Sequence, residues 1–351
     1  MCWKHLLHLR ESRNKSDIWR RINSLNKNTA DILVCPKCQN DKALELAIDE
    51  ERGEDVIAGT LACQDCENEY PITNGIARFV AVNDDYCENF GFQWQKWKDI
   101  QIDRLSGHSL SEKRFLGDSG WSPEWIKNKL ILDGGCGAGR FSDVVAGHGA
   151  HVIACDLSSA IDACRETTLI HDGRVDCIQA SLFELPFRQG TFDGVFCMGV
   201  IQHTPDPAMV IQSLPRHLKT GGKLAYNFYE KSIFCWGQFI KYGLRLFTRY
   251  MSVESTLRLS HFLVKLLFPI TYFLAPIPKI RILNFFLPIC ASHSSELNKD
   301  QQLTWTLLDT FDWYGPRYEK RQRHWKVAQM LEAQGMIEVE SRSGIVQAIQ
   351  K

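Results

Sequence analysis

From residue 129 onward, short apolar runs alternate with amphipathic stretches long enough to form helices. Strands alternating with helices predict right-handed βαβ units and a parallel, doubly wound sheet, so the fold class is α/β and Rossmann-like. A helix near residues 325–334 precedes two final strands, whose hairpin adds an antiparallel strand near the edge of the sheet. The seven predicted strands are residues 130–132, 151–155, 175–179, 194–198, 223–228, 336–340 and 345–349.

The pattern changes several times along the chain, which divides it into six parts. The first part is polar and helix-prone, the second holds paired cysteines in strand-like pieces, and the third is rich in Trp and Phe. The predicted parts are an N-terminal helical extension (1–30), a four-cysteine unit (31–82), an aromatic helical linker or cap (83–128), the Rossmann-like core (129–229), a helical apolar and basic insert (230–300), and the C-terminal part of the core domain (301–351).

Composition narrows the function classes. Lysine plus arginine equals aspartate plus glutamate, so no global charge favours binding to nucleic acid, which makes a nucleic-acid partner unexpected. The odd number of cysteines, 13, argues against a disulfide framework and predicts a reducing, cytoplasmic location. No apolar signal region begins the chain, and no uninterrupted apolar stretch reaches the roughly 20 residues needed to span a bilayer.

A glycine-rich turn follows the first strand of the core. Gly135, Gly137 and Gly139 let the backbone turn tightly and approach a ligand, and a helix is predicted from about residue 140. Asp133 lies just ahead of the turn, and Asp156 ends the second strand, 23 residues later. An acid at that place can accept hydrogen bonds from ribose hydroxyls. The G-x-G-x-G spacing differs from the dinucleotide fingerprint G-x-G-x-x-G.

Five segments in this order resemble the motifs of class I S-adenosylmethionine (SAM)-dependent methyltransferases of the type 11 kind: 132–139, 154–158, 180–187, 192–207 and 218–224. The resemblance implies SAM as cofactor. Many relatives carry aspartate where this chain has Ser181, which weakens the contact expected on the adenine side. The cofactor-binding residues that the resemblance implies are Asp133, Gly135, Gly137, Gly139, Asp156, Leu157, Ser181, Leu182, Met198 and Gly199.

Methyl transfer from a sulfonium mainly requires positioning, and an oxygen nucleophile can also need a base. His203 follows the fourth strand, at the carboxyl end of the sheet, where ligands bind in doubly wound folds. It is the candidate base or substrate contact, because histidine titrates near neutrality. A hydrogen-bonding role in closing the loop explains it equally well. Asp312 is a weaker candidate in an aromatic segment, 312–318, that reads as a loop.

Four cysteines form two C-x-x-C pairs, Cys35 with Cys38 and Cys63 with Cys66, and 24 residues separate the pairs. Two such pairs can supply four thiolates to a tetrahedral, structural Zn²⁺. Redox pairs are the alternative, but two pairs in one short segment favour zinc. Together with residues 69–79, the pairs are similar to the zinc-ribbon family that includes the activator subunit of several methyltransferases. The ribbon would brace the catalytic domain or help to hold substrate.

Residues 233–290 combine an apolar run with recurring basic residues. The run, 262–276, is interrupted by Lys265, Pro269 and Pro276. Apolar faces with basic flanks suit a helix lying on a membrane surface, and they suit a helical lid over the active site equally well. The lid is favoured, and peripheral membrane contact is compatible with it if the acceptor is linked to a lipid.

These observations predict SAM-dependent methyl transfer, by in-line displacement, to a small-molecule or a lipid- or glycan-linked acceptor. Oxygen is the expected target atom, and the arrangement resembles bacterial enzymes of secondary-metabolite or glycan pathways. An RNA or protein methyltransferase is the first alternative, motivated by the ribbon and the basic insert. A non-catalytic SAM-binding module is the second, motivated by Ser181.

Overall fold

All seven predicted strands are present in the computed structural model, which describes residues 25–38, 40–80, 88–232, 237–277 and 284–351. Their order is β8-β7-β6-β9-β10-β12-β11. The first five are mutually parallel, and β12 runs antiparallel to both of its neighbours, so the predicted fold class is confirmed. Their bounds are β6 (Leu130–Gly134), β7 (His151–Asp156), β8 (Val175–Gln179), β9 (Phe192–Met198), β10 (Leu218–Asn227), β11 (Ile337–Arg342) and β12 (Ile345–Ile349).

Helices cover both faces of this sheet, as its mostly buried parallel strands β6, β7, β8 and β9 require. Neighbouring residues on β6 show the alternation: Leu132 packs into the core on one face and Ile131 into the core on the other, and both are fully buried. The helices of the core are α8 (Arg140–Gly147), α9 (Ala160–Thr168), α10 (Pro207–Ser213) and α14 (His324–Glu332), with short 3₁₀ turns at η2 (Leu169–His171), η3 (Ile201–His203) and η4 (Leu214–His217).

The cysteine-bearing N-terminal unit joins the same sheet, which makes it 12-stranded. Strand β5 pairs in parallel with β8, with Ala77 opposite Ile178, and so covers an edge that would otherwise expose unpaired backbone groups. Residues 25–26 form a strand instead of the predicted helix, and residues 1–24 of that extension lie outside the described residues. The elements are β1 (Leu25–Asn26), α3 (Lys27–Ala30), β2 (Glu45–Arg52), β3 (Asp55–Ala62), β4 (Glu69–Thr73) and β5 (Ile76–Arg78).

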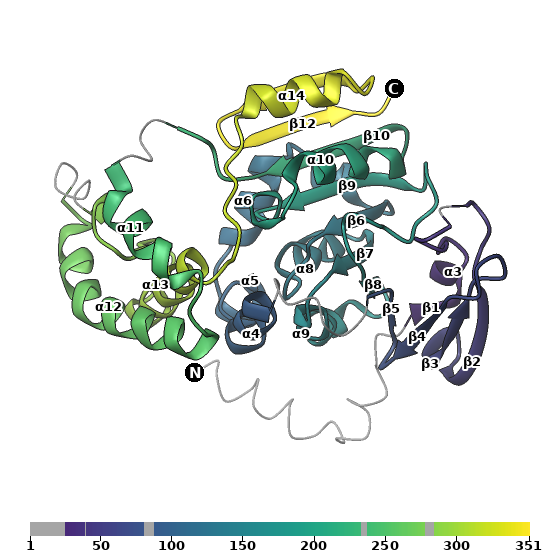
Figure 1. The fold of residues 1–351 in the computed structure, drawn as a ribbon, viewed down its shortest axis with the longest axis horizontal. Helices are drawn as coiled ribbons and strands as arrows, with labels where there is room; N and C mark the ends of the chain where they lie inside the picture. The colour runs from purple at the N-terminus through teal and green to yellow at the C-terminus, as the bar shows by residue number, and fades with distance from the viewer. Residues whose placement is uncertain (1–24, 39, 81–87, 233–236, 278–283) are drawn as a thin grey trace.

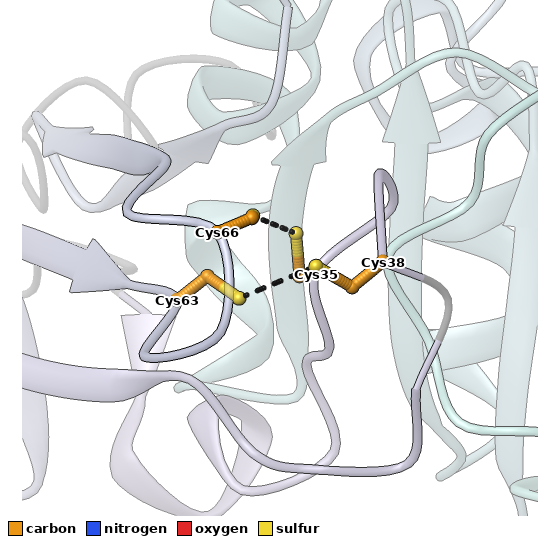
Figure 2. Close-up of side chains that lie close together, drawn as sticks. All are labelled: Cys35, Cys38, Cys63 and Cys66. Atoms are coloured by element: carbon orange, nitrogen blue, oxygen red, sulfur yellow. Dashed lines mark hydrogen bonds between the residues drawn. The ribbon is translucent and has the colours of Figure 1, made fainter.

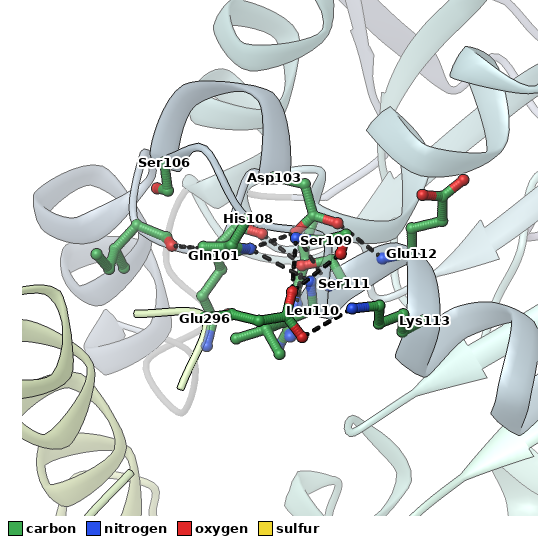
Figure 3. Close-up of polar contacts among 12 residues, drawn as sticks. Gln101, Asp103, Ser106, His108, Ser109, Leu110, Ser111, Glu112, Lys113 and Glu296 are labelled. Carbon is green, nitrogen blue, oxygen red and sulfur yellow. Dashed lines mark hydrogen bonds and ion pairs between the residues drawn. The ribbon is translucent and has the colours of Figure 1, made fainter. Parts of the chain in front are cut away.

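A series of short helices connects this unit to β6. Figure 3 shows how polar contacts fix them: the two Asp103 oxygens each accept a hydrogen bond, at 2.9 Å, from the backbone N–H groups of Ser111 and Glu112. Glu296 pairs with Lys113 at 2.8 Å, which ties a segment far along the chain to the same place. The helices are α4 (Glu88–Trp97), α5 (Asp103–Ser106), α6 (Leu110–Ser119) and α7 (Pro123–Ile126).

The insert contributes helices α11 (Phe239–Thr248) and α12 (Val253–Leu274), which pack beside α13 (Lys299–Tyr314) at the end of the molecule opposite the N-terminal strands (Figure 1). The α12 helix is 22 residues long and continues past Pro269, which lies inside it. Among the described residues it alone is long and apolar enough to cross a membrane by length and composition. This corrects the expectation that the prolines and Lys265 leave every apolar run too short. Of its most apolar stretch, 28% is buried.

Candidate active site

A cavity of about 730 Å³ lies at the carboxyl ends of β6, β7, β9 and β10. One side of it comes from the core of the sheet and the other from the linker, the insert and α13. The core side includes Gly135, Gly137, Asp156, Leu157, Leu182, Phe183, Met198, Gly199 and His203. The far side includes Phe90, Gln93, Trp94, Arg140, Tyr229, Gln238, Phe285, Cys290, Leu308, Asp309, Asp312, Trp313 and Arg321.

The glycines of the loop after β6 are required by their backbone and by close neighbours. Gly135 has φ +84° and Gly137 φ +54°, both in the left-handed region. A Cβ on Gly135 would lie 2.5 Å from a methyl carbon of Val200, and one on Gly137 would lie 2.9 Å from the indole nitrogen of Trp94. The loop backbone is therefore held tightly between Val200, which follows β9, and Trp94 of α4, with one side open to the cavity.

Asp156 stands at the end of β7, on the cavity wall. One carboxylate oxygen accepts the backbone N–H of Gly137 at 2.9 Å, and the other accepts the N–H and the hydroxyl of Ser158 at 2.8 and 2.7 Å. Burial raises the pKa of this carboxyl, and the hydrogen bonds from Ser158 and Gly137 oppose the rise. A carboxylate has about four acceptor positions, so about one remains for a ligand.

Three of the predicted cofactor residues do not line the cavity. Asp133 is 2% exposed and accepts the Ser142 hydroxyl at 2.6 Å, which anchors the first turns of α8. Burial raises the pKa of Asp133 to about 7. A Cβ on Gly139 would meet the Cys164 sulfur at 2.9 Å, so this glycine serves packing against α9. The Ser181 hydroxyl accepts the Phe183 N–H at 3.2 Å and shapes the turn whose next two residues do line the cavity.

His203 is buried in η3 and lines the cavity between the core and the far wall. Its Nδ1 lies 3.1 Å from the Tyr318 carbonyl oxygen. Because a carbonyl only accepts, this contact assigns the proton to Nδ1 and leaves Nε2 as a free acceptor. The centroid of its ring lies 5.3 Å from that of the Phe90 ring and 5.5 Å from that of the Tyr229 ring. Burial lowers the pKa of His203, and the negative charge of Asp312 opposes the decrease.

The far wall carries two acidic residues, one helical turn apart on α13. Asp312 accepts the Gln93 amide at 3.1 Å and the Tyr229 hydroxyl at 3.3 Å. Burial, and then the neighbouring Asp312, raise the pKa of Asp309 to about 7. Burial lowers the pKa of Arg140, on the same wall, to about 9. The sequence missed Asp309, although an i, i+3 spacing with Asp312 would have placed both on one helix face.

The structure also revises the environment predicted for Asp312. The segment 312–318 was expected to be a loop, but Asp312, Trp313 and Tyr314 form the last turn of α13. The buried Trp313 nitrogen has no hydrogen-bond partner within the described structure. Because an indole N–H only donates, this group is suited to an oxygen on a bound molecule.

The paired cysteines converge from two loops (Figure 2). The four sulfurs all lie within 4.8 Å of one another and could hold a metal ion. Cys35 and Cys66 are 3.6 Å apart, and Cys38 and Cys63 are 3.8 Å apart. A tetrahedral metal with Zn–S distances of about 2.3 Å requires sulfurs about 3.8 Å apart, so the four residues fit zinc.

Two parts of the chain match known families. Residues 132–226 match the family described as a methyltransferase domain. The chain therefore contains a methyltransferase domain. Residues 26–75 match the family described as a Trm112p-like protein, so a zinc-ribbon-type domain is fused ahead of it, and both predicted resemblances are confirmed. The family supports SAM as the cofactor.

Curated relatives resemble part of the chain. The ubiquinone biosynthesis O-methyltransferase of Xanthomonas oryzae pv. oryzae is 41% identical over 145 residues, which are 39% of this chain and 57% of the relative. The enzyme of the same name from Xylella fastidiosa is 38% identical over 104 residues, 28% of this chain and 41% of the relative. The chain thus spans about half the length of the relatives that it matches.

Solved structures give more distant resemblances. A methyltransferase from Bacillus halodurans has a TM-score of 0.34 and 22% identity, over 40% of this chain and 60% of that one. A complex between the Haloferax volcanii Trm112 methyltransferase activator and a methyltransferase has a TM-score of 0.35 and 18% identity, over 43% and 63%.

The Trm112p-like domain contacts the methyltransferase domain next to the loop that follows β8. The N–H of Val34 donates to the carbonyl of Pro186 at 3.0 Å, and the N–H of Arg188 donates to the carbonyl of Ile32 at 3.1 Å. Lys37, within the first cysteine pair, forms an ion pair with Glu184 at 2.8 Å. Leu182 and Phe183 on this loop line the cavity, whereas none of the described Trm112p-like residues does. Its contacts therefore support the cavity wall from behind.

Proposed function

We propose that this chain transfers the methyl group of SAM to an oxygen of a small-molecule acceptor or of a lipid- or glycan-linked one. The observation that carries the proposal is the cavity: the glycine loop and Asp156 form one side, and linker, insert and α13 side chains form the other. The names of the curated relatives favour O-methylation. When bound, SAM supplies an electrophilic methyl group, and the protein has to position both reactants and exclude water.

The cofactor would be held at the core side. The free acceptor position of Asp156 suits a ribose hydroxyl, while Leu157, Leu182 and Met198 supply apolar contacts. Gly135, Gly137 and Gly199 let the backbone approach closely. Three predicted cofactor residues do not line the cavity and are proposed to shape its wall instead. Asp133 anchors α8, Gly139 allows close packing on α9, and Ser181 closes the adenine-side turn.

His203 is the proposed base. Its Nε2 is free to accept a proton from an acceptor hydroxyl, because Nδ1 is committed to the Tyr318 carbonyl. Its lowered pKa keeps the ring neutral near pH 7, which is the form that can accept a proton. Asp312 lies close enough to stabilise the imidazolium that forms.

The four thiolates of Cys35, Cys38, Cys63 and Cys66 are proposed to bind a structural Zn²⁺. The Tyr70 hydroxyl lies 3.2 Å from the Cys35 sulfur, and the Asn68 amide donates to the Cys66 sulfur at 3.0 Å. Such outer contacts orient the ligands of a metal site. Four protein ligands leave no open position, so the metal would stabilise the domain without entering the reaction.

The remaining proposals concern location and partners. The ten cysteines in the described part of the chain are unpaired, which supports a reducing, cytoplasmic compartment. The zero net charge gives no support to a nucleic-acid partner. The insert is proposed to serve as part of the cavity wall, through Gln238, Phe285 and Cys290, and to contact a membrane peripherally.

The test is incubation of the full chain with methyl-labelled SAM and host extract separated into small-molecule, lipid, RNA and protein pools. Label in the small-molecule or lipid pool, lost in Asp156→Ala together with SAM binding, supports the proposal. His203→Asn should lower kcat by about 100-fold or more while SAM affinity stays within about threefold. Label confined to RNA or protein, or SAM binding with no label in any pool, would overturn it.

A further inference from the structure

Helix α11 buries its polar side chains and exposes its apolar ones, the reverse of a helix on a globular surface. Lys241 and Arg245 are only 5% and 7% exposed, whereas Phe239 and Phe247 are 66% and 73% exposed. A helix of ten residues with this arrangement leaves an apolar face without a partner in the described part of the chain.

Two buried side chains of α11, Arg245 and Thr248, hold the helix in an orientation that keeps its apolar face outward. The Arg245 guanidinium pairs with Glu319 at 3.3 Å and donates to the carbonyls of Pro316, at 2.7 Å, and Trp313. The Thr248 hydroxyl donates to the Tyr314 carbonyl at 3.1 Å. Turning the helix would leave a buried carboxylate and several carbonyls unpaired, which is strongly unfavourable.

Helix α12 also exposes large apolar side chains at helical spacing, over a longer distance. Its buried face is mixed, because Thr256, Ser260 and Thr271 lie there together with Val264 and Phe268, which pack into an apolar cluster. The exposed apolar residues are Phe262, Leu266, Ile270 and Phe273. Together with Phe239, Leu246, Phe247 and Tyr250 of α11 they define what we call the insert surface.

The exposed charges on these two helices are mostly positive, which favours an anionic partner. Over residues 239–274 the only acidic residue is Glu254, and the exposed basic residues are Arg249, Arg258 and Lys265. These two helices therefore carry more exposed basic than acidic residues, although the whole chain has no net charge. Apolar side chains with basic residues at their flanks are the composition of helices that lie in the interface of an anionic bilayer.

The insert surface adjoins the cavity. Gln238 and Phe285 line the cavity, and their chain neighbours Phe239 and Phe286 are exposed. The rings of Phe285 and Phe286 are in contact, with centroids 5.5 Å apart. Exposed apolar side chains therefore adjoin the far wall of the cavity at Phe239 and at Phe286.

We propose that α11 and α12 lie in the interface of an anionic bilayer, and that the acceptor is an amphiphile taken from it. The polar part of this acceptor, which carries the hydroxyl, enters the cavity, while its apolar part follows Phe285 and Phe286 to the bilayer. The helices lie on the membrane without crossing it, since the inner face of α12 packs against α13. The assignment of the acceptor rests on the proposed methyl transfer, but the membrane contact does not.

The first test is co-sedimentation of the full chain with phosphatidylcholine vesicles, with and without phosphatidylglycerol. We expect binding that requires the anionic lipid, weakens with salt, and falls about tenfold or more in the double variant Phe247→Asp, Phe273→Asp. Ile170→Asp is the matched control, because Ile170 is equally exposed but lies on η2. Absence of binding, equal loss in the control, or concentration-dependent self-association removed by the double variant would overturn the membrane contact.

The second test compares label transfer from SAM into host membranes and into the water-soluble small-molecule pool. The double variant should lose most transfer into membranes while its SAM affinity stays unchanged, which also shows that it is folded. Label that enters only the water-soluble pool, equally for both proteins, overturns the amphiphile and leaves methyl transfer standing. SAM binding without label in any pool is a failure of the proposed function itself.

Discussion

Replacing Asp309 with asparagine should make the protein more stable, and more so as the pH rises. Burial raises the pKa of this carboxyl from 3.8 to about 7 in the folded protein. Between these values the unfolded chain is ionised while the folded protein keeps the proton. The contribution of this carboxyl to the free energy of unfolding is therefore fully present below about pH 4 and is lost as the pH rises to about 7.

The magnitude follows from the size of the shift. One pKa unit corresponds to 1.36 kcal/mol, so the full shift is on the order of 4 kcal/mol. Asp309 borders a cavity that water can enter, so about 2 kcal/mol is a reasonable expectation. Asparagine keeps an oxygen that can accept from the Trp305 side chain, the existing partner of this carboxyl, and removes the ionisation.

The assay is thermal or urea unfolding of the wild type and Asp309→Asn at pH 5 and pH 8, without ligand. At pH 8 the variant should melt roughly 4 °C or more above the wild type, and at pH 5 the difference should shrink. Asp49→Asn is the control, since Asp49 is exposed on β2, away from the cavity. A variant destabilised equally at both pH values would refute the reasoning, because it would show that the carboxylate is satisfied in the folded protein.

Two further predictions address the loop and the metal. Gly135→Ala should weaken SAM binding about tenfold or more in calorimetry, because the left-handed backbone costs about 1–2 kcal/mol and the new Cβ would overlap Val200. Gly173→Ala is the matched control. Gly173 has a left-handed backbone as well (φ +77°) but no neighbour within 4 Å, so alanine adds only backbone strain there and should leave SAM affinity unchanged. Zinc chelation or Cys63→Ser should raise amide hydrogen exchange at residues 182–188 and weaken SAM binding, because the Trm112p-like domain supports this loop. Unchanged exchange at these residues would contradict that support.

Local patterns in the sequence were sufficient for much of the fold. Strands β8 and β12 have the predicted bounds, and the helix from residue 140 begins where the glycine turn ends. These features depend on a few consecutive residues: apolar runs that are buried on both faces, and glycines that adopt backbone angles closed to other residues. The cysteine spacing likewise determined which four sulfurs would meet.

The tertiary structure decided which side chains face the cavity. Asp133 and Ser181 match the motif in sequence, but one anchors α8 and the other closes a turn. No sequence motif contains Asp309, and the packing of α13 against α4 brings it to the cavity wall. A motif specifies a backbone path, whereas the direction of a side chain depends on neighbours distant in the chain.

The direction of the insert helices was also decided only in three dimensions. The sequence showed apolar and basic residues in 233–290, favoured a lid and left membrane contact open. Burial of Arg245 against Glu319 and the carbonyls near the end of α13 turns the phenylalanines of α11 outward, and those partners lie about 70 residues further along the chain. The sequence therefore determined what the insert is made of, and long-range pairing of a buried charge determined which face it presents.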